Sequence, residues 1–319
     1  GSVRGGVLYS DGQFDDARLA IALAQTLVEQ GGLAVNYTRV VRLLKTGGRI
    51  TGLVARDLET NTEFEVPAKV VVNATGVFGE AIMRLDADGE SSADQPASAP
   101  VRIVASQGTH IVLPHEFLDG PSAMLIPHTD DSRVLFAIPW HGKSLIGTTD
   151  NRVLDISLEP RPLAGEIDYL LEHVGRYLAR QPTTADVLSV FSGLRPLVGQ
   201  AVNSAQGGKQ KLATSKLSRE HQSLTSASGL ITVIGGKWTT YRKMGEDIID
   251  LAAQVAGLNT RPSATAELPL HGSPQSDSGA PNTDPWQIYG TDRAQLLELA
   301  EQETNWSARL DERLDIVAA

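Results

Sequence analysis

Two segments carry glycine where an apolar strand ends, a pattern typical of backbone that lies close to a ligand. In 69–76 the run Lys-Val-Val-Val is followed by Asn-Ala-Thr-Gly, and Gly76 allows close approach to a cofactor. In 229–242 the run Leu-Ile-Thr-Val-Ile precedes Gly235-Gly236-Lys237 and a predicted helix N-terminus. The unpaired N–H groups and dipole of such a terminus favour phosphate or an electron-rich carbonyl. An ordinary strand-to-loop turn and a Thr-capped helix are the alternatives.

Two further segments carry side chains that can act on an anionic substrate. Pro196 forces Arg195 toward an extended backbone, and an arginine on an apolar strand needs a partner. That partner is either an anionic substrate or a structural carboxylate. His110 enters an apolar run shortly after Gly108. It is predicted to be a general base, a substrate contact or a hydrogen-bonded structural residue.

The spacing of other polar residues excludes several classes of site. A nucleotide P-loop fails because Ile231 stands where its first glycine is needed and Trp238 follows Lys237 in place of Ser or Thr. His110 and His115 lack a third ligand at metal-binding spacing, so no metal is predicted. Neither a G-x-S-x-G nucleophile elbow nor an H-E-x-x-H zinc helix occurs.

Composition limits the class of protein further. The 319 residues predict about two domains. With 28 Lys and Arg against 38 Asp and Glu, the net charge is −10, which argues against nucleic acid as the main ligand. The absence of Cys excludes disulfides, Cys zinc sites, Fe–S clusters and thiol nucleophiles. No run reaches the ~20 apolar residues of a membrane span, and the sequence begins without a signal pattern.

The elements that must position these residues are short strands with a few helices between them. Helices are predicted over 15–27, 167–178, 239–255 and 293–319. Strands are predicted over 33–38, 40–44, 52–56, 69–73, 101–105, 109–113, 133–140, 144–147, 187–192 and 230–234. A loop is expected over 86–100 and a linker over 271–285. The predicted last helix has no capping Gly or Pro, so we expect a piece of a longer chain.

Seven segments, taken in order, resemble the FAD-dependent glycerol-3-phosphate dehydrogenases, particularly the mitochondrial and related bacterial forms. The matching segments are Tyr9–Arg18, Val72–Gly76, Gly108–Val112, Ile146–Asp150, Ser192–Leu197, Ser218–His221 and Gly235–Arg242. Each segment alone is weak evidence for the family, but seven segments in the same order are specific to it. The resemblance runs from about residue 5 to residue 271. The family's first βαβ unit, with its G-x-G-x-x-G, is absent, which argues against tight FAD binding by this chain alone.

The resemblance implies an α/β fold with a discontinuous, doubly wound FAD-binding domain of the glycine oxidase and D-amino-acid oxidase type. That domain is expected over 1–85, without its first βαβ unit, and again over 190–270. An antiparallel-sheet substrate cap is expected over 100–185. The linker over 271–285 then leads to the start of a C-terminal helical domain over 286–319.

The resemblance also implies oxidation of sn-glycerol 3-phosphate to dihydroxyacetone phosphate, with hydride transfer to FAD and electrons passed to quinone. His110 and Arg195 are the implied catalytic residues, and His110 is the favoured base because of its pKa range. Arg195 and Arg219 are expected to bind the substrate phosphate, with His110 and Lys237 as further substrate contacts. The implied cofactor-binding residues are Ala74, Thr75, Gly76, Gly235, Gly236, Lys237, Thr239 and Thr240.

Other functions share parts of this pattern. A glycerophosphate oxidase or an amine or amino-acid oxidase would have the same fold, although the pair Arg195 and Arg219 favours a phosphate over a single carboxylate. A catalytically inactive, flavin-free fragment and a binding module for sugar phosphates are alternatives from other classes. The resemblance implies a cytoplasmic location with peripheral association at the inner membrane, although no amphipathic anchor is evident in the sequence. A homodimer is one alternative, because the sequence does not determine the oligomeric state.

Overall fold

The structure is a computed structural model that describes residues 5–87, 102–127, 129–130, 133–199, 220–273, 285–302, 306 and 308. The chain divides into two compact units. One unit is formed by Gly1–Asn36 with Ser263–Ala319, and the other by Tyr37–Pro262. The domain boundaries expected from the sequence stay a prediction, because this division does not test which segments hold a cofactor.

The smaller unit contains helices joined by side-chain contacts. These elements are α1 (Asp16–Glu29), η6 (Pro285–Asp292) and α5 (Arg293–Gln302). Asp15 caps α1 by accepting hydrogen bonds from the backbone N–H groups of Ala17 and Arg18, both at 3.0 Å. Arg18 donates to the Ile288 carbonyl at 3.1 Å and lies 4.8 Å from the centre of the Tyr289 ring. These two contacts attach η6 to α1.

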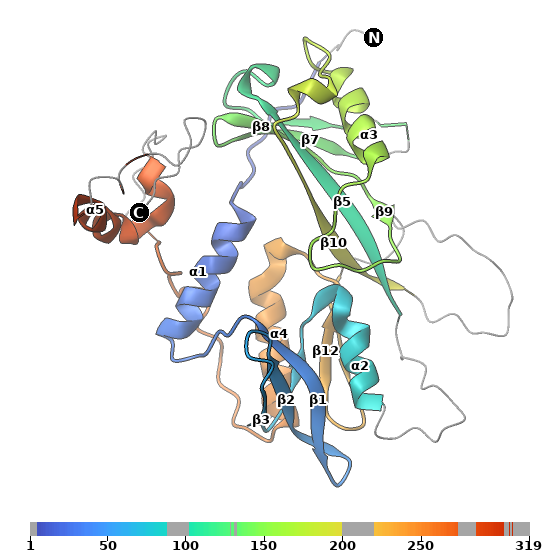
Figure 1. Ribbon diagram of the computed structural model, residues 1–319, viewed down its shortest axis with the longest axis vertical. Coiled ribbons are helices and arrows are strands. Elements are labelled where there is room, and N and C mark those ends of the chain that lie inside the picture. The colour runs from blue at the N-terminus through green and yellow to red at the C-terminus, as the bar shows by residue number, and fades with distance from the viewer. Residues whose placement is uncertain are drawn as a thin grey trace, which may run out of the picture. The chain divides into compact units, whose positions relative to one another are not determined.

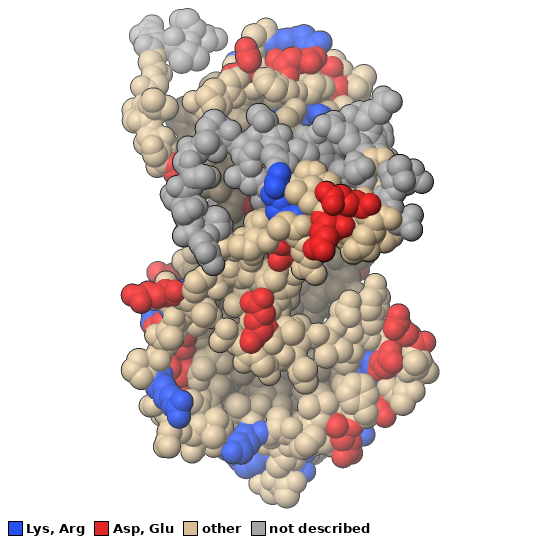
Figure 2. All heavy atoms as spheres, turned by 90° about the vertical axis from the view of Figure 1, so that its left-hand side faces the viewer, with Lys and Arg blue, Asp and Glu red and all other residues tan. Residues whose placement is uncertain are grey.

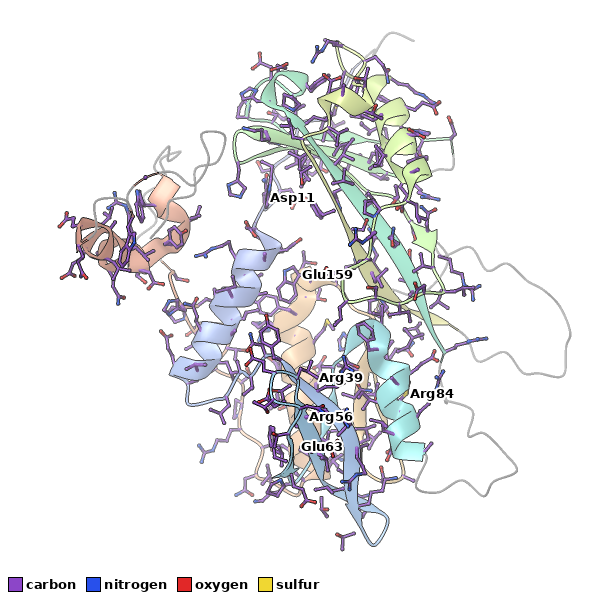
Figure 3. All side chains as sticks on the ribbon, in the orientation of Figure 1. Asp11, Arg39, Arg56, Glu63, Arg84 and Glu159 are labelled. Carbon is purple, nitrogen blue, oxygen red and sulfur yellow. The ribbon has the colours of Figure 1, made fainter. Side chains whose placement is uncertain are left out.

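The larger unit begins with a three-stranded antiparallel sheet in the order β1-β2-β3. Its strands are β1 (Thr38–Thr46), β2 (Arg49–Asp57) and β3 (Glu63–Pro67). Gly47 and Gly48 connect β1 to β2 with φ of 58° and 75°, values that glycine adopts at low cost. Arg56 and Glu63 form an exposed ion pair at 2.5 Å across β2 and β3 and lie side by side in Figure 3.

The central sheet is six-stranded and antiparallel, with the order β10-β5-β8-β7-β6 and β9 paired to β5. Its strands are β5 (Arg102–Pro114), β6 (Met124–Ile126), β7 (Leu135–Trp140), β8 (Lys143–Gly147), β9 (Asn151–Arg152) and β10 (Ser189–Gly199). Helix α3 (Ala164–Gly175) covers one face of this sheet (Figure 1). Ile111, Ile146, Leu170 and Val174 are fully buried between them and form the largest core cluster.

A smaller sheet brings together segments that lie far apart in the sequence, in the order β11-β12-β4. It consists of β4 (Val72–Asn73), β11 (Gln222–Thr225) and β12 (Ile231–Ile234), with α2 (Gly79–Ala87) and α4 (Tyr241–Val255) beside β12 in Figure 1. Strands β12 and β4 are parallel, so their carboxyl ends lie at the same edge. Ile231, Ile248 and Ala252 form the buried contact between β12 and α4.

Several strand predictions are wrong in ways that have a physical cause. The predicted strands 101–105 and 109–113 form one strand, β5, because Gly108 continues the ladder opposite Gly193. The strand predicted over 187–192 continues to Gly199 as the partner of β5. No strand forms over 33–37, where Leu33 and Val35 are 88% and 69% exposed and have no ladder partner.

Other boundaries also shift. In the predicted strand 69–73 only Val72–Asn73 belongs to β4. The loop predicted over 86–100 starts later, since Asp86 lies in α2, buried and ion-paired with Lys45 at 3.0 Å. Helix α2 was not predicted. The rest of that loop, most of the linker over 271–285, and most of the predicted helix beyond Gln302 lie outside the described residues.

Candidate functional site

The pairing of β5 with β10 places His110 and Arg195 on one face of the central sheet. His110 is opposite Phe191, and Gly108 is opposite Gly193. Side chains two residues apart share a face of a strand, so Phe191, Gly193 and Arg195 share the face that carries His110. We call this face the site face. The alternate residues of β5 point to α3, which covers the other face.

Arg195 reaches across the site face to the segment that follows β8. Its Nη1 donates to the carbonyl of Thr149 at 3.2 Å, and its Nη2 donates to Oγ1 of Thr148 at 3.1 Å. The guanidinium lies directly over Gly108, where a Cβ atom would be 2.6 Å from Cζ of Arg195. Glycine at position 108 therefore makes room for the arginine. The extended backbone predicted for Arg195 from Pro196 is confirmed, because both lie in β10.

His110 is held between an aromatic ring and a glycine. Its imidazole stacks on Phe191 with ring centres 5.1 Å apart and planes inclined by 11°. A Cβ atom on Gly147 would lie 2.5 Å from Nε2 of His110. Burial first, and then the positive charge of Arg195, lower the pKa of His110 to about 4. At neutral pH the ring is therefore neutral, which is the form that accepts a proton, but the lowered pKa makes it a weaker base than the ordinary range that favoured His110 in the sequence.

A buried carboxylate supports the site from the α3 side. Glu166 is 3% exposed and accepts hydrogen bonds from Gln107 and Thr109 of β5, both at 2.7 Å. It also accepts from Thr149 at 2.7 Å and from Asn151 at 2.8 Å. These hydrogen bonds lower the pKa of Glu166 although burial acts to raise it, so the group is an anion at neutral pH. The Thr149 that binds Glu166 through its hydroxyl binds Arg195 through its carbonyl.

The predicted cofactor-binding residues gather at the carboxyl edge of the parallel pair β12 and β4. Ala74, Thr75 and Gly76 follow β4, while Gly235 and Gly236 follow β12. The φ angles of the three glycines are 57°, 75° and 84°, so both turns use conformations that favour glycine. Open α/β sheets bind ligands at this edge, and side chains no larger than threonine leave the backbone accessible to a planar ring. The residues present therefore fit a flavin.

Two polar side chains shape these turns. Asn73 is 2% exposed, accepts a hydrogen bond from Oγ1 of Thr75 at 2.7 Å and donates to the Gly79 carbonyl at 3.0 Å. Thr240 donates to the Lys237 carbonyl at 3.0 Å. The predicted helix start at Thr239 is a short 3-10 turn over Trp238–Thr240, and α4 proper begins at Tyr241. Lys237, Thr239 and Thr240 are exposed.

Strand β10 adjoins this edge through side chains that alternate with Arg195 and so point to its other face. A Cβ atom on Gly76 would lie 4.0 Å from Cγ of Pro196, and one on Gly235 would lie 3.4 Å from Cγ2 of Val198. The strand that carries Arg195 therefore passes beside both turns. Arg219 lies outside the described residues. Sequence reasoning missed Glu166 and Phe191, since an isolated Glu in a helix and an apolar residue in a strand give no functional signal.

Three other observations concern metal ions, surface charge and membranes. Within the described residues, no group of three or more His, Asp and Glu side chains is placed to hold a metal ion. On the face that Figure 2 shows, Lys and Arg are scattered among Asp and Glu and do not gather into a basic patch. In the described part of the chain, no helix combines the length and apolar character needed to cross a membrane.

Comparison with known proteins gives the class to which this fold and site belong. A family model described as FAD dependent oxidoreductase matches residues 1–242. The chain belongs to this family of FAD-dependent oxidoreductases. The predicted fold class and the assignment of FAD as the cofactor of the family are thereby confirmed.

The most informative relatives are glycerol-3-phosphate dehydrogenases. The mitochondrial enzyme of Saccharomyces cerevisiae is 37% identical over 290 residues, covering 85% of this chain and 45% of the relative. The human mitochondrial enzyme is 38% identical over 276 residues, which cover 84% of this chain and 36% of the human enzyme. The glycerol-3-phosphate dehydrogenase of Bacillus halodurans, solved with FAD, superimposes with a TM-score of 0.73 at 28% identity, covering 90% of this chain and 58% of that one. The chain thus spans less than half the length of these curated relatives.

Proposed function

We propose that this chain provides the substrate-binding face and one side of the flavin site of an FAD-dependent enzyme that oxidises sn-glycerol 3-phosphate to dihydroxyacetone phosphate. The observation that carries the proposal is that His110 and Arg195 share one sheet face and that β10, the strand of Arg195, passes beside the Gly76 and Gly235 turns. The similarity to glycerol-3-phosphate dehydrogenases supports the choice of substrate.

In this proposal, different residues of the chain bind the substrate and accept its proton. The chemistry supplied by bound FAD is acceptance of the hydride from C2 of the substrate. Arg195 presents a fixed guanidinium to the phosphate, oriented by Thr148 and Thr149. His110, neutral because its pKa is about 4, accepts the proton of the C2 hydroxyl at Nε2 or Nδ1. Arg219 is proposed as a second phosphate ligand.

The turns at the edge of the parallel pair are proposed to hold the cofactor ring. Ala74, Thr75 and Gly76 would line it from one strand, and Gly235 and Gly236 from the other. Lys237 and the N–H groups near Thr239 and Thr240 would stabilise negative charge that develops on the ring. Transfer of electrons to quinone and peripheral membrane association are further parts of the proposal, supported by the family resemblance.

The test is a steady-state assay of the FAD-loaded full-length protein, because this chain alone is not expected to bind FAD tightly. We expect glycerol 3-phosphate to reduce a quinone analogue, with little oxygen consumption and no activity on glycine. Oxygen consumption in place of quinone reduction would instead indicate an oxidase, and activity on glycine would reject the phosphate substrate.

A matched pair of variants examines the role of Arg195. Arg195→Lys keeps the charge but removes the planar fork, so it should raise KM for glycerol 3-phosphate strongly. Arg56→Lys makes the same change in the exposed pair with Glu63, and its kinetics should equal those of the unmodified enzyme. Unchanged KM in Arg195→Lys contradicts phosphate binding by Arg195.

A further inference from the structure

Three glycines of the site face lie close to His110 and Arg195, and packing against the described residues explains two of them. Gly108 makes room for the guanidinium of Arg195, and Gly147 makes room for the imidazole of His110. Gly193, opposite Gly108, is different. A Cβ atom built on Gly193 would meet no heavy atom of the described residues within 4 Å.

Backbone conformation does not explain Gly193 either. Its φ lies outside the positive range that favours glycine, so any residue can adopt this conformation. Glycine in the interior of a strand weakens the strand because it costs backbone entropy and packs no side chain. A glycine with neither a steric nor a conformational cause within the chain often marks close approach of a ligand to the backbone.

The surroundings of Gly193 indicate which ligand that is. On one side along β10 is Phe191, stacked on His110, and on the other is Arg195. The Arg195 side chain leans over Gly108 toward Thr149, so the Cα of Gly193 is left uncovered between the aromatic pair and the guanidinium. Gly193 is exposed in this chain. A ligand that contacts both this guanidinium and His110 lies next to Gly193, because Gly193 is the strand partner of Gly108, over which the guanidinium is placed.

We propose that Gly193 is the floor of the substrate slot and sets its depth, so that the carbon chain of a small phosphate ester lies against the bare backbone there. This proposal rests on the function proposed above for the same face. A methyl group at position 193 would occupy the slot without meeting any of the described residues. Gly193 is thus a specificity-determining residue whose replacement should affect ligand binding and leave folding intact.

The test compares Gly193→Ala and Gly193→Val with a control, Gly245→Ala, in the full-length FAD-loaded enzyme. Gly245 lies in α4, is exposed, and its added Cβ also meets nothing within 4 Å. We expect Gly193→Ala to keep the melting temperature and the flavin content while kcat/KM for glycerol 3-phosphate falls about tenfold, the scale of overpacking by one methyl group. Gly193→Val should lower kcat/KM for glycerol 3-phosphate further. Gly245→Ala should change neither kcat nor KM.

Calorimetric titration with dihydroxyacetone phosphate separates this proposal from the proposed activity. Weaker binding to Gly193→Ala than to the unmodified protein supports the slot even if no oxidation is observed. Equal binding and equal kcat/KM in the two proteins overturns it. Loss of FAD from Gly193→Ala also overturns it, because the bare backbone would then lie under the cofactor and not under the substrate.

Discussion

The buried carboxylate of Glu166 should stabilise the larger unit only while it is ionised. Glu166 accepts hydrogen bonds from the backbone of Leu163 and from four side chains. In Glu166→Gln the shape is kept, but the charge is lost and one acceptor oxygen becomes a donor that faces Thr149 and Asn151. Hydrogen bonds to a charged group contribute about 1.5–3 kcal/mol each, against about 1 kcal/mol for neutral ones. Relief of the buried charge offsets part of the loss, so we expect a destabilisation of about 2–4 kcal/mol at pH 7.

The sign of the pH dependence follows from the lowered pKa of Glu166. A carboxyl whose pKa is lower in the folded state stabilises that state above its unfolded pKa, which is about 4.3 for Glu. The stabilisation is lost as pH falls through the folded pKa. The difference in unfolding free energy between Glu166→Gln and the unmodified protein should therefore be largest at neutral pH and shrink progressively below pH of about 4.

Urea unfolding followed by circular dichroism at a series of pH values measures this difference. Glu172→Gln is the matched control, because Glu172 lies on the same helix in an exposed pair with Arg176 at 2.6 Å. Such surface pairs contribute about 0–1 kcal/mol, so the control should unfold almost as the unmodified protein does. A Glu166→Gln destabilisation that is independent of pH, or no larger than that of the control, would refute the reasoning.

Three further outcomes are expected. Gly108→Ala should displace the Arg195 guanidinium and raise KM for glycerol 3-phosphate by about tenfold or more, with an unchanged melting temperature, since only this side chain must move. The contribution of His110 to kcat/KM should be complete at neutral pH and should fall as pH drops through about 4. His110→Gln should remove this decrease at low pH from the profile. The pKa of His271 is raised by its hydrogen bonds to Glu29 and Asp292, so it stabilises the smaller unit below the unfolded pKa of about 6.5 and loses this effect as pH rises through its raised pKa. Amide hydrogen exchange in α1 should therefore speed up at alkaline pH by more than the ordinary increase of exchange rates with pH. His271→Gln should abolish this additional increase.

The sequence determined the features that depend on local chemistry. The helix predicted from residue 15 forms as α1, with Asp15 as its N-cap, and Pro196 fixes the extended backbone at Arg195. The turns after the two apolar strands use positive φ at Gly76 and Gly235, as glycine there indicates. Motif order alone also led to the family of FAD-dependent oxidoreductases, which the comparison with the family model confirms. Apart from the motif order, these signals lie within a few residues of the feature they predict, so no long-range contact has to be known.

Only the tertiary structure decided which of these residues meet. The pairing of β5 with β10 sets His110 beside Phe191. Gly108 fell between two predicted strands, but it lies within β5, where its lack of a side chain leaves room for the Arg195 guanidinium. Glu166 lies 59 residues from Gln107 and 57 from Thr109, and nothing near it in the sequence shows that the two would share its carboxylate. The physical reason is that strand register and helix docking are fixed by the summed burial of the core between α3 and the central sheet, to which residues distant in sequence contribute together.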